Sequence, residues 1–315
     1  MSIKRLCQWR DATAYLRVTM ALLMMSCVPT LPAYAQTPIP QTVYFPSADG
    51  KTELVGYLFM PVTPGPYPAV VMLHGRGGPY SANINAACSQ VGRDQKSPCD
   101  GTNLSKRHMM WGEYWATHGY VALHVDSFGP RGRGHGYGRG THGEPDRDAV
   151  NELTVRPLDA TGALTYLVQR KDILPNHVML QGWSNGGSTA LNVMLRQTQS
   201  NAASAAPEFR AALVFYPGCG PRALASQRYQ ANSPIWIFLG SDDEEVSPSV
   251  CANILRNTRS MESKGHDTKR VEVVWYDGAT HDFDDPGAKR QAIANNRIAK
   301  DDSMRRAAGL FDDLP

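Results

Sequence analysis

Residues 178–191 read VMLQGWSNGGSTAL, and this stretch decides the fold. It opens with an apolar run typical of a buried strand and closes in a run that favours a helix. Between them, residues 182–186 match the pattern G-x-S-x-G, whose glycines permit a tight turn from strand to helix. The turn exposes Ser184 at the helix N-terminus, where backbone N–H groups favour negative charge. We therefore predict that Ser184 is a nucleophile; the alternative is a Gly-rich phosphate turn or a plain strand-to-helix connection.

The rest of the chain alternates strands and helices around this motif. Most of its apolar runs are short and continuous, which is typical of parallel strands buried on both faces by helices. We predict strands at residues 42–45, 53–59, 69–73, 120–125, 177–181, 211–216, 234–239 and 271–276. We predict helices at residues 111–117, 148–169, 186–196 and 249–264, and from about 288 onward. This order predicts an α/β fold with a mostly parallel central sheet, helices on both faces, and chemistry at the carboxyl ends of the strands.

A nucleophilic serine needs a general base, and the base needs a carboxylate to orient it. His281 follows the last predicted strand, so it is placed at the catalytic edge of the sheet, and we predict that it is the base. The strand before it is followed by four consecutive acidic residues, of which we prefer Asp243 to Asp242 as the triad acid. The order Ser184, Asp243, His281 is the order found in α/β-hydrolases.

The same chemistry needs N–H donors for the oxyanion of a tetrahedral intermediate. We predict that one donor is the backbone of Asn185, the residue after the nucleophile. The other belongs to the Gly-rich loop at residues 74–78, HGRGG, where we predict the N–H of Arg76, with the flanking glycines as neighbours. His74 is predicted to orient this loop. A plain Gly-rich turn is the alternative.

A second Gly-rich segment, residues 129–143, contains seven glycines, three arginines and two histidines. Its position after a predicted strand places it on the catalytic face, so we predict a mobile lid or an anion-binding rim. Arg131 and Tyr137 are the candidates for binding an anionic or polar substrate. A surface loop without a role is the alternative, and His135 and His142 give only a weak indication of metal binding.

The N-terminus is typical of a targeting segment. Residues 1–35 contain four basic residues, an 11-residue apolar stretch at 18–28, and Ala-Tyr-Ala at 33–35, which together predict a cleaved secretory signal peptide. An uncleaved anchor is the alternative. This segment holds the whole net charge of +3, because the remaining residues carry 28 basic and 28 acidic side chains. We therefore expect a bacterial periplasmic or secreted protein that binds no nucleic acid and has no stable membrane association after cleavage.

Export changes the interpretation of the cysteines. Four remain after the predicted cleavage, an even number in an oxidising compartment. We favour the pairs Cys88–Cys99 and Cys219–Cys251 among the three possible pairings, with four free thiols as the alternative. The first pair lies in an insertion at about residues 79–108, and residues 36–315 are expected to form one domain.

The motifs resemble the dienelactone hydrolase family of α/β-hydrolases, and more narrowly an exported branch with a serine nucleophile. The resemblance rests on LHGRGG, HVDSFGPRG, QGWSNGG, FYPGC, LGSDDEEVSP and YDGATHDFD, which occur in this order between about residues 40 and 290. Dienelactone hydrolases proper use a cysteine where this chain has Ser184. They carry an acidic residue where it has Arg76, so the resemblance does not transfer the dienelactone substrate.

Together the residues and the resemblance predict a serine hydrolase that cleaves small carboxylic esters or lactones through an acyl-enzyme. Neither a metal nor an organic cofactor is implied, and a monomer or small homo-oligomer is expected. A peptidase or acyltransferase of the same fold is the alternative enzyme, and a non-catalytic binding protein that uses the same pocket is the alternative of another class.

Overall fold

The computed structural model describes residues 39–200, 206–254, 271–312 and 314. The predicted signal peptide and the end of the predicted helix 249–264 lie outside these residues. No helix in the described part of the chain is long and apolar enough to cross a membrane.

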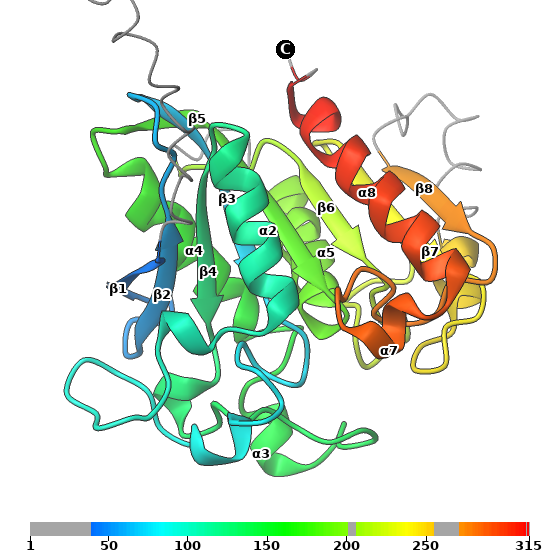
Figure 1. The fold of residues 1–315 in the computed structure, drawn as a ribbon, viewed down its shortest axis with the longest axis horizontal. Coiled ribbons are helices and arrows are strands. Elements are labelled where there is room, and N and C mark those ends of the chain that lie inside the picture. The colour runs from blue at the N-terminus through cyan, green and yellow to red at the C-terminus, as the bar shows by residue number, and fades with distance from the viewer. Residues whose placement is uncertain (1–38, 201–205, 255–270, 313, 315) are drawn as a thin grey trace, which may run out of the picture. The chain divides into compact units, whose positions relative to one another are not determined.

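A single eight-stranded sheet forms the centre of the fold, in the order β1-β2-β4-β3-β5-β6-β7-β8 (Figure 1). The strands are β1 Gln41–Pro46, β2 Glu53–Phe59, β3 Tyr67–Leu73, β4 Val121–Asp126, β5 Ile173–Trp183, β6 Ala212–Phe215, β7 Ile235–Gly240 and β8 Val271–Tyr276. Strands β1 and β2 pair antiparallel, as does β2 with β4, and every other pairing is parallel. The predicted mostly parallel α/β sheet is confirmed.

Helices cover both faces of the sheet. The described helices are α2 Lys106–Thr117, α3 Pro145–Asp148, α4 Arg156–Val168, α5 Asn185–Gln199, α7 Ala288–Gln291 and α8 Ala294–Asp312. Helices α4 and α5 contribute to one apolar core, and α2 and α8 contribute to the core on the opposite face (Figure 1). Residues buried on both sides of the sheet explain the continuous apolar runs of the sequence.

The helix predicted at residues 148–169 begins later than expected, at Arg156. The Asn151 side chain accepts hydrogen bonds from the N–H groups of Leu153 and Thr154, which stabilises a turn in place of the helix. Pro157 then occupies the first helical turn, where its missing N–H costs nothing. Of the predicted helix 249–264, residues 248–254 are helical and the others lie outside the described part.

Strand register brings distant segments to one edge of the sheet. Leu73 at the end of β3 pairs with Gly182 on β5, and Gly182 pairs with Val214 on β6. The loop at 74–78, the turn at Ser184 and the end of β6 therefore leave the sheet at the same level.

At this edge, the insertion at about residues 79–108 packs on the Gly-rich segment at residues 129–143. The structure contains both predicted disulfides, Cys88–Cys99 and Cys219–Cys251. Backbone hydrogen bonds of 3.0 Å join the insertion to the Gly-rich segment, from Val91 N–H to the Gly129 carbonyl and from Gly134 N–H to the Ser89 carbonyl. Figure 1 shows both segments, in cyan and green, beyond the end of β4.

Candidate active site

Ser184 lies in a strained turn between β5 and α5. Its φ of 50° is unusual for a residue with a side chain, and its N–H donates to the Phe215 carbonyl at 2.9 Å. The turn is tight enough to require glycine on both sides. A Cβ on Gly182 would lie 2.2 Å from the Gly186 carbonyl oxygen, and one on Gly186 would lie 2.1 Å from the Leu73 carbonyl oxygen. These clashes explain the spacing of the G-x-S-x-G pattern.

The loops after β7 and β8 bring Asp243 and His281 together. The His281 Nδ1–H donates to Asp243 Oδ2 at 2.7 Å, and both side chains are almost fully buried. Because a carboxylate only accepts, this bond leaves Nε2 as the unprotonated nitrogen of the neutral ring. The other Asp243 oxygen accepts from the backbone N–H groups of Glu245 and Val246, whereas Asp242 is exposed and accepts from the hydroxyl of its neighbour.

The environment of His281 favours its protonated form. Burial alone would lower the pKa of the imidazole, but the hydrogen bond to Asp243 and the charges of Asp282, Asp243 and Glu245 raise the pKa above its ordinary value. A carboxylate that stabilises an imidazolium is what a general base requires when it takes a proton from a hydroxyl.

Two cavities meet at Ser184. One of about 210 Å³ is lined by Ser184, His281, Arg107 and the loop at 74–78, among others. The other, of about 170 Å³, is lined by Ser184, Asn185 and residues 138–142 of the Gly-rich segment, among others. The predicted serine and histidine therefore face one space, with a second space on the other side of the serine.

The predicted oxyanion donors lie beside this space. The backbone N–H groups of Arg76 and Asn185 have no hydrogen-bond partner among the residues that the structure describes. A Cβ on Gly75 would lie 3.5 Å from the Cβ of Ser184, so the loop at 74–78 passes close to the serine. His74 is fully buried and holds this loop, because its Nδ1–H donates to the Gly75 carbonyl at 2.8 Å.

Arg131 and Tyr137 do not line either cavity, contrary to the prediction. The Arg131 guanidinium binds Asp159 and Asp49 at 2.8 and 3.1 Å, which ties the segment to α4 and to the β1–β2 turn. The Tyr137 hydroxyl donates to the Asp146 carbonyl. Both side chains already have hydrogen-bond or ion-pair partners in the protein, which indicates that they stabilise the fold and do not bind substrate.

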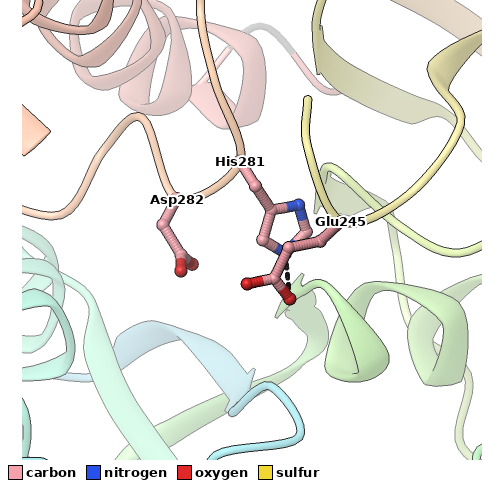
Figure 2. A group of neighbouring side chains, drawn as sticks. All are labelled: Glu245, His281 and Asp282. Atoms are coloured by element: carbon pink, nitrogen blue, oxygen red, sulfur yellow. Dashed lines mark ion pairs between the residues drawn. The ribbon is translucent and has the colours of Figure 1, made fainter. Parts of the chain in front are cut away.

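Glu245 and Asp282 flank His281 and form with it the one group of possible metal ligands found in the described part of the chain (Figure 2). Glu245 Oε2 lies 3.9 Å from His281 Nε2. Each carboxylate already pairs with guanidinium groups, Glu245 with Arg76 at 2.9 Å and Asp282 with Arg107. The negative charge that would attract a cation is therefore neutralised by arginine.

Sequence reasoning missed a buried network beneath His281. Asp284 is fully buried and accepts hydrogen bonds of 2.8 Å from the indole N–H groups of Trp111 and Trp183 and a shorter one from the Tyr216 hydroxyl. The Tyr216 ring lies 4.6 Å from the His281 ring, centroid to centroid. Asp284 thus connects the histidine loop to the residue before Ser184. Its only sequence signal is its place in the acidic stretch HDFDDP.

Similar solved structures share the fold. An apo form of Thermogutta terrifontis esterase 2 is 18% identical, with a TM-score of 0.58, over 90% of this chain and 98% of that one. A dienelactone hydrolase-like promiscuous phosphotriesterase from metagenomic libraries is 18% identical, with a TM-score of 0.61, over 88% and 99%. The T. terrifontis esterase phosphorylated by paraoxon is 19% identical, with a TM-score of 0.53, over 85% and 95%.

No curated protein sequence matches the chain. The family model of the dienelactone hydrolase family matches residues 101–314, which include the serine turn and the loops that carry Asp243 and His281. The chain therefore belongs to the dienelactone hydrolase family of α/β-hydrolases and is a carboxylic ester hydrolase.

Proposed function

We propose that the protein hydrolyses small carboxylic esters or lactones through a covalent acyl-enzyme on Ser184, with His281 as general base and Asp243 as its orienting carboxylate. The observation that carries the proposal is the shared cavity of Ser184 and His281, with the His281 Nδ1–H held by Asp243 at 2.7 Å. This arrangement supplies a nucleophile, a free Nε2 and a fixed tautomer.

In the proposed reaction, the Ser184 oxygen attacks the ester carbonyl carbon and passes its proton to His281 Nε2. The carbonyl oxygen becomes an oxyanion, for which the N–H groups of Asn185 and Arg76 are the donors. The C–O bond then breaks, and His281 gives the proton to the leaving oxygen. Water, activated by the same histidine, attacks the acyl-enzyme and regenerates the serine.

The position of His281 supports a proposal for how the two cavities hold the two parts of the substrate. Because His281 must reach the leaving oxygen, the alcohol part belongs in the cavity of about 210 Å³ that it lines. The acyl part then belongs in the cavity of about 170 Å³ beyond Asn185. Both are smaller than the roughly 300–1,000 Å³ of pockets for drug-sized ligands, which favours short acyl and alcohol groups.

The test compares steady-state hydrolysis of p-nitrophenyl acetate, butyrate and octanoate by the wild type, Ser184→Ala and Ser188→Ala. Ser188 is the matched control for the nucleophile: it lies one turn further along α5, also lines the cavity of about 170 Å³, and its hydroxyl donates to the Gly218 carbonyl at 2.8 Å. We expect acetate and butyrate to be preferred, and a loss on the order of 10³-fold or more only in Ser184→Ala. Equal loss in both variants, or none in Ser184→Ala, would refute the assignment.

Export is also proposed. Two disulfides support an oxidising compartment, because disulfides are rare where thiols are kept reduced. N-terminal sequencing of the protein isolated from its bacterial host tests this, and a mature N-terminus near residue 36 is expected. Full-length protein in the cytoplasmic fraction would contradict it.

A further inference from the structure

Arg156, the first residue of α4, is fully buried and reaches both segments that supply the proposed oxyanion donors. Its Nη1–H donates to the Asn185 side-chain oxygen at 2.5 Å, and its Nη2–H donates to the His74 carbonyl at 2.8 Å. Asn185 directly follows the proposed nucleophile, and His74 begins the loop that carries Arg76. One guanidinium therefore bridges the two sides of the oxyanion site.

This guanidinium has no acidic partner within ion-pair distance in the described part of the chain, unlike its buried neighbour Arg147, which pairs with Glu152 at 2.8 Å. It packs over the Phe128 ring, 4.9 Å from its centroid. Burial and the charge of Arg147 lower the pKa of Arg156 to about 9, against the opposing effect of the charges of Asp159 and Glu152, so the group is still a cation at neutral pH. A buried cation without a direct ion-pair partner carries a desolvation cost, which an anion arriving nearby would offset in part.

A second observation also favours a negative charge beside Asn185. Helix α5 begins at Asn185 and has no acidic residue in its first turn, so the positive end of its dipole is also uncompensated. Because Arg156 donates to Asn185 Oδ1, the orientation of that amide is fixed, and its Nδ2 is buried without a partner among the described residues. A cation, a helix N-terminus and unused N–H groups thus converge beside Ser184.

We propose that Arg156 is a positioning residue for the oxyanion hole, which fixes the Asn185 and Arg76 segments and places a buried positive charge behind the developing oxyanion. The inference rests on the proposed acyl-enzyme chemistry at Ser184. It predicts stabilisation of the tetrahedral state rather than of the bound ester, so it acts on kcat more than on KM.

The experiment measures kcat, KM and two inhibition constants for the wild type, Arg156→Met, Arg156→Lys and Asn185→Ala. The first inhibitor is a short alkyl trifluoromethyl ketone: the serine oxygen adds to its carbonyl carbon, the serine proton passes to His281, and the carbonyl oxygen becomes an oxyanion. The second is the matching methyl ketone, which occupies the site mainly as the unreacted ketone. Asn185→Ala keeps the backbone N–H and removes the side-chain amide, both the Oδ1 acceptor of Arg156 and the unpartnered Nδ2–H group.

Arg131→Met is the matched control, because Arg131 is also a mostly buried arginine of this region but pairs with Asp49 and Asp159. For Arg156→Met we expect kcat to fall about 10- to 100-fold, less than the roughly 10²–10³-fold of deleting an oxyanion donor. The trifluoromethyl ketone constant should rise by a similar factor, and the methyl ketone constant should not change. Arg156→Lys, which keeps the charge, should recover part of the loss, and Asn185→Ala should show the same pattern more weakly.

The control Arg131→Met should lower the melting temperature and leave all four constants nearly unchanged. The proposal is overturned if folded Arg156 variants keep the wild-type kcat, or if both ketones lose affinity equally. If Arg156→Met does not fold, Asn185→Ala and Arg156→Lys decide by the same two ketones. A wild type that neither turns over esters nor binds the trifluoromethyl ketone would instead refute the proposed function.

Discussion

Replacing Asp243 by Asn removes one negative charge while keeping the shape of the site. The Asp243 oxygen that accepts from the Glu245 and Val246 N–H groups is retained in Asn, so the loop should keep its conformation. The other position, 2.7 Å from His281 Nδ1, becomes an amide group that donates. His281 must then accept at Nδ1 and carry its proton on Nε2, which is the wrong tautomer for taking a proton from Ser184.

We expect kcat of Asp243→Asn to fall on the order of 10⁴-fold, which corresponds to about 5 kcal/mol of transition-state stabilisation. The pH profile should also move. Activity requires the neutral imidazole, and the pKa of His281 is raised in the wild type, so wild-type kcat/KM should be lost as the pH falls through that raised value. Without the Asp243 charge the pKa drops, and the residual activity should persist to lower pH.

Stopped-flow and steady-state assays with p-nitrophenyl acetate from pH 5 to 9 measure both effects. Asp242→Asn is the control, because Asp242 is exposed and, among the described residues, its carboxylate accepts from the Ser241 hydroxyl and its N–H donates to the Ala279 carbonyl. It should match the wild type in rate and profile. A large loss in Asp242→Asn together with a small loss in Asp243→Asn would refute the reasoning.

Three further predictions concern stability and are checked by denaturant unfolding. Arg131→Ala should lower the free energy of unfolding by about 3–5 kcal/mol, because it leaves Asp159 buried without its cation; a raised KM with unchanged stability would contradict this. Gly186→Ala should lower the free energy of unfolding by about 3 kcal/mol, because its Cβ would clash with the Leu73 carbonyl. Wild-type stability of this variant would show that the turn can accommodate a side chain. Replacing Cys219 and Cys251 by serine should lower the free energy of unfolding by about 4 kcal/mol, because their disulfide closes a loop with a sequence separation of 32. Replacing Cys88 and Cys99, whose separation is 11, should lower it by about 3 kcal/mol. The reverse order would contradict the loop-entropy model.

The placement of Ser184, Asp243 and His281 at one edge of the sheet could be predicted because each position depends on local sequence. The glycines around Ser184 mark a turn that tolerates no side chain, and His281 and Asp243 each follow an apolar run that ends at the catalytic edge. The strand order did not need to be known, because parallel strands deliver their following loops to the same edge.

The roles of the arginines could not be predicted, because they depend on which carboxylates lie nearby in space. Arg131 sits in a Gly-rich segment that resembles a binding rim, yet its partners Asp49 and Asp159 are far from it in the sequence. Arg156 fell in the middle of the helix predicted at 148–169, where an arginine is ordinarily a surface residue. The actual helix start at Arg156 places it at the end of α4 that faces the site.

Ser184 is proposed to form the covalent intermediate. The most direct test is peptide mapping by mass spectrometry after treatment of the wild type, Ser184→Ala and Ser188→Ala with paraoxon, the reagent that phosphorylated the similar T. terrifontis esterase. We predict one diethyl phosphoryl group, on Ser184, in the wild type and Ser188→Ala, and none in Ser184→Ala. Labelling of another residue, or equal labelling of Ser184→Ala, would contradict the account.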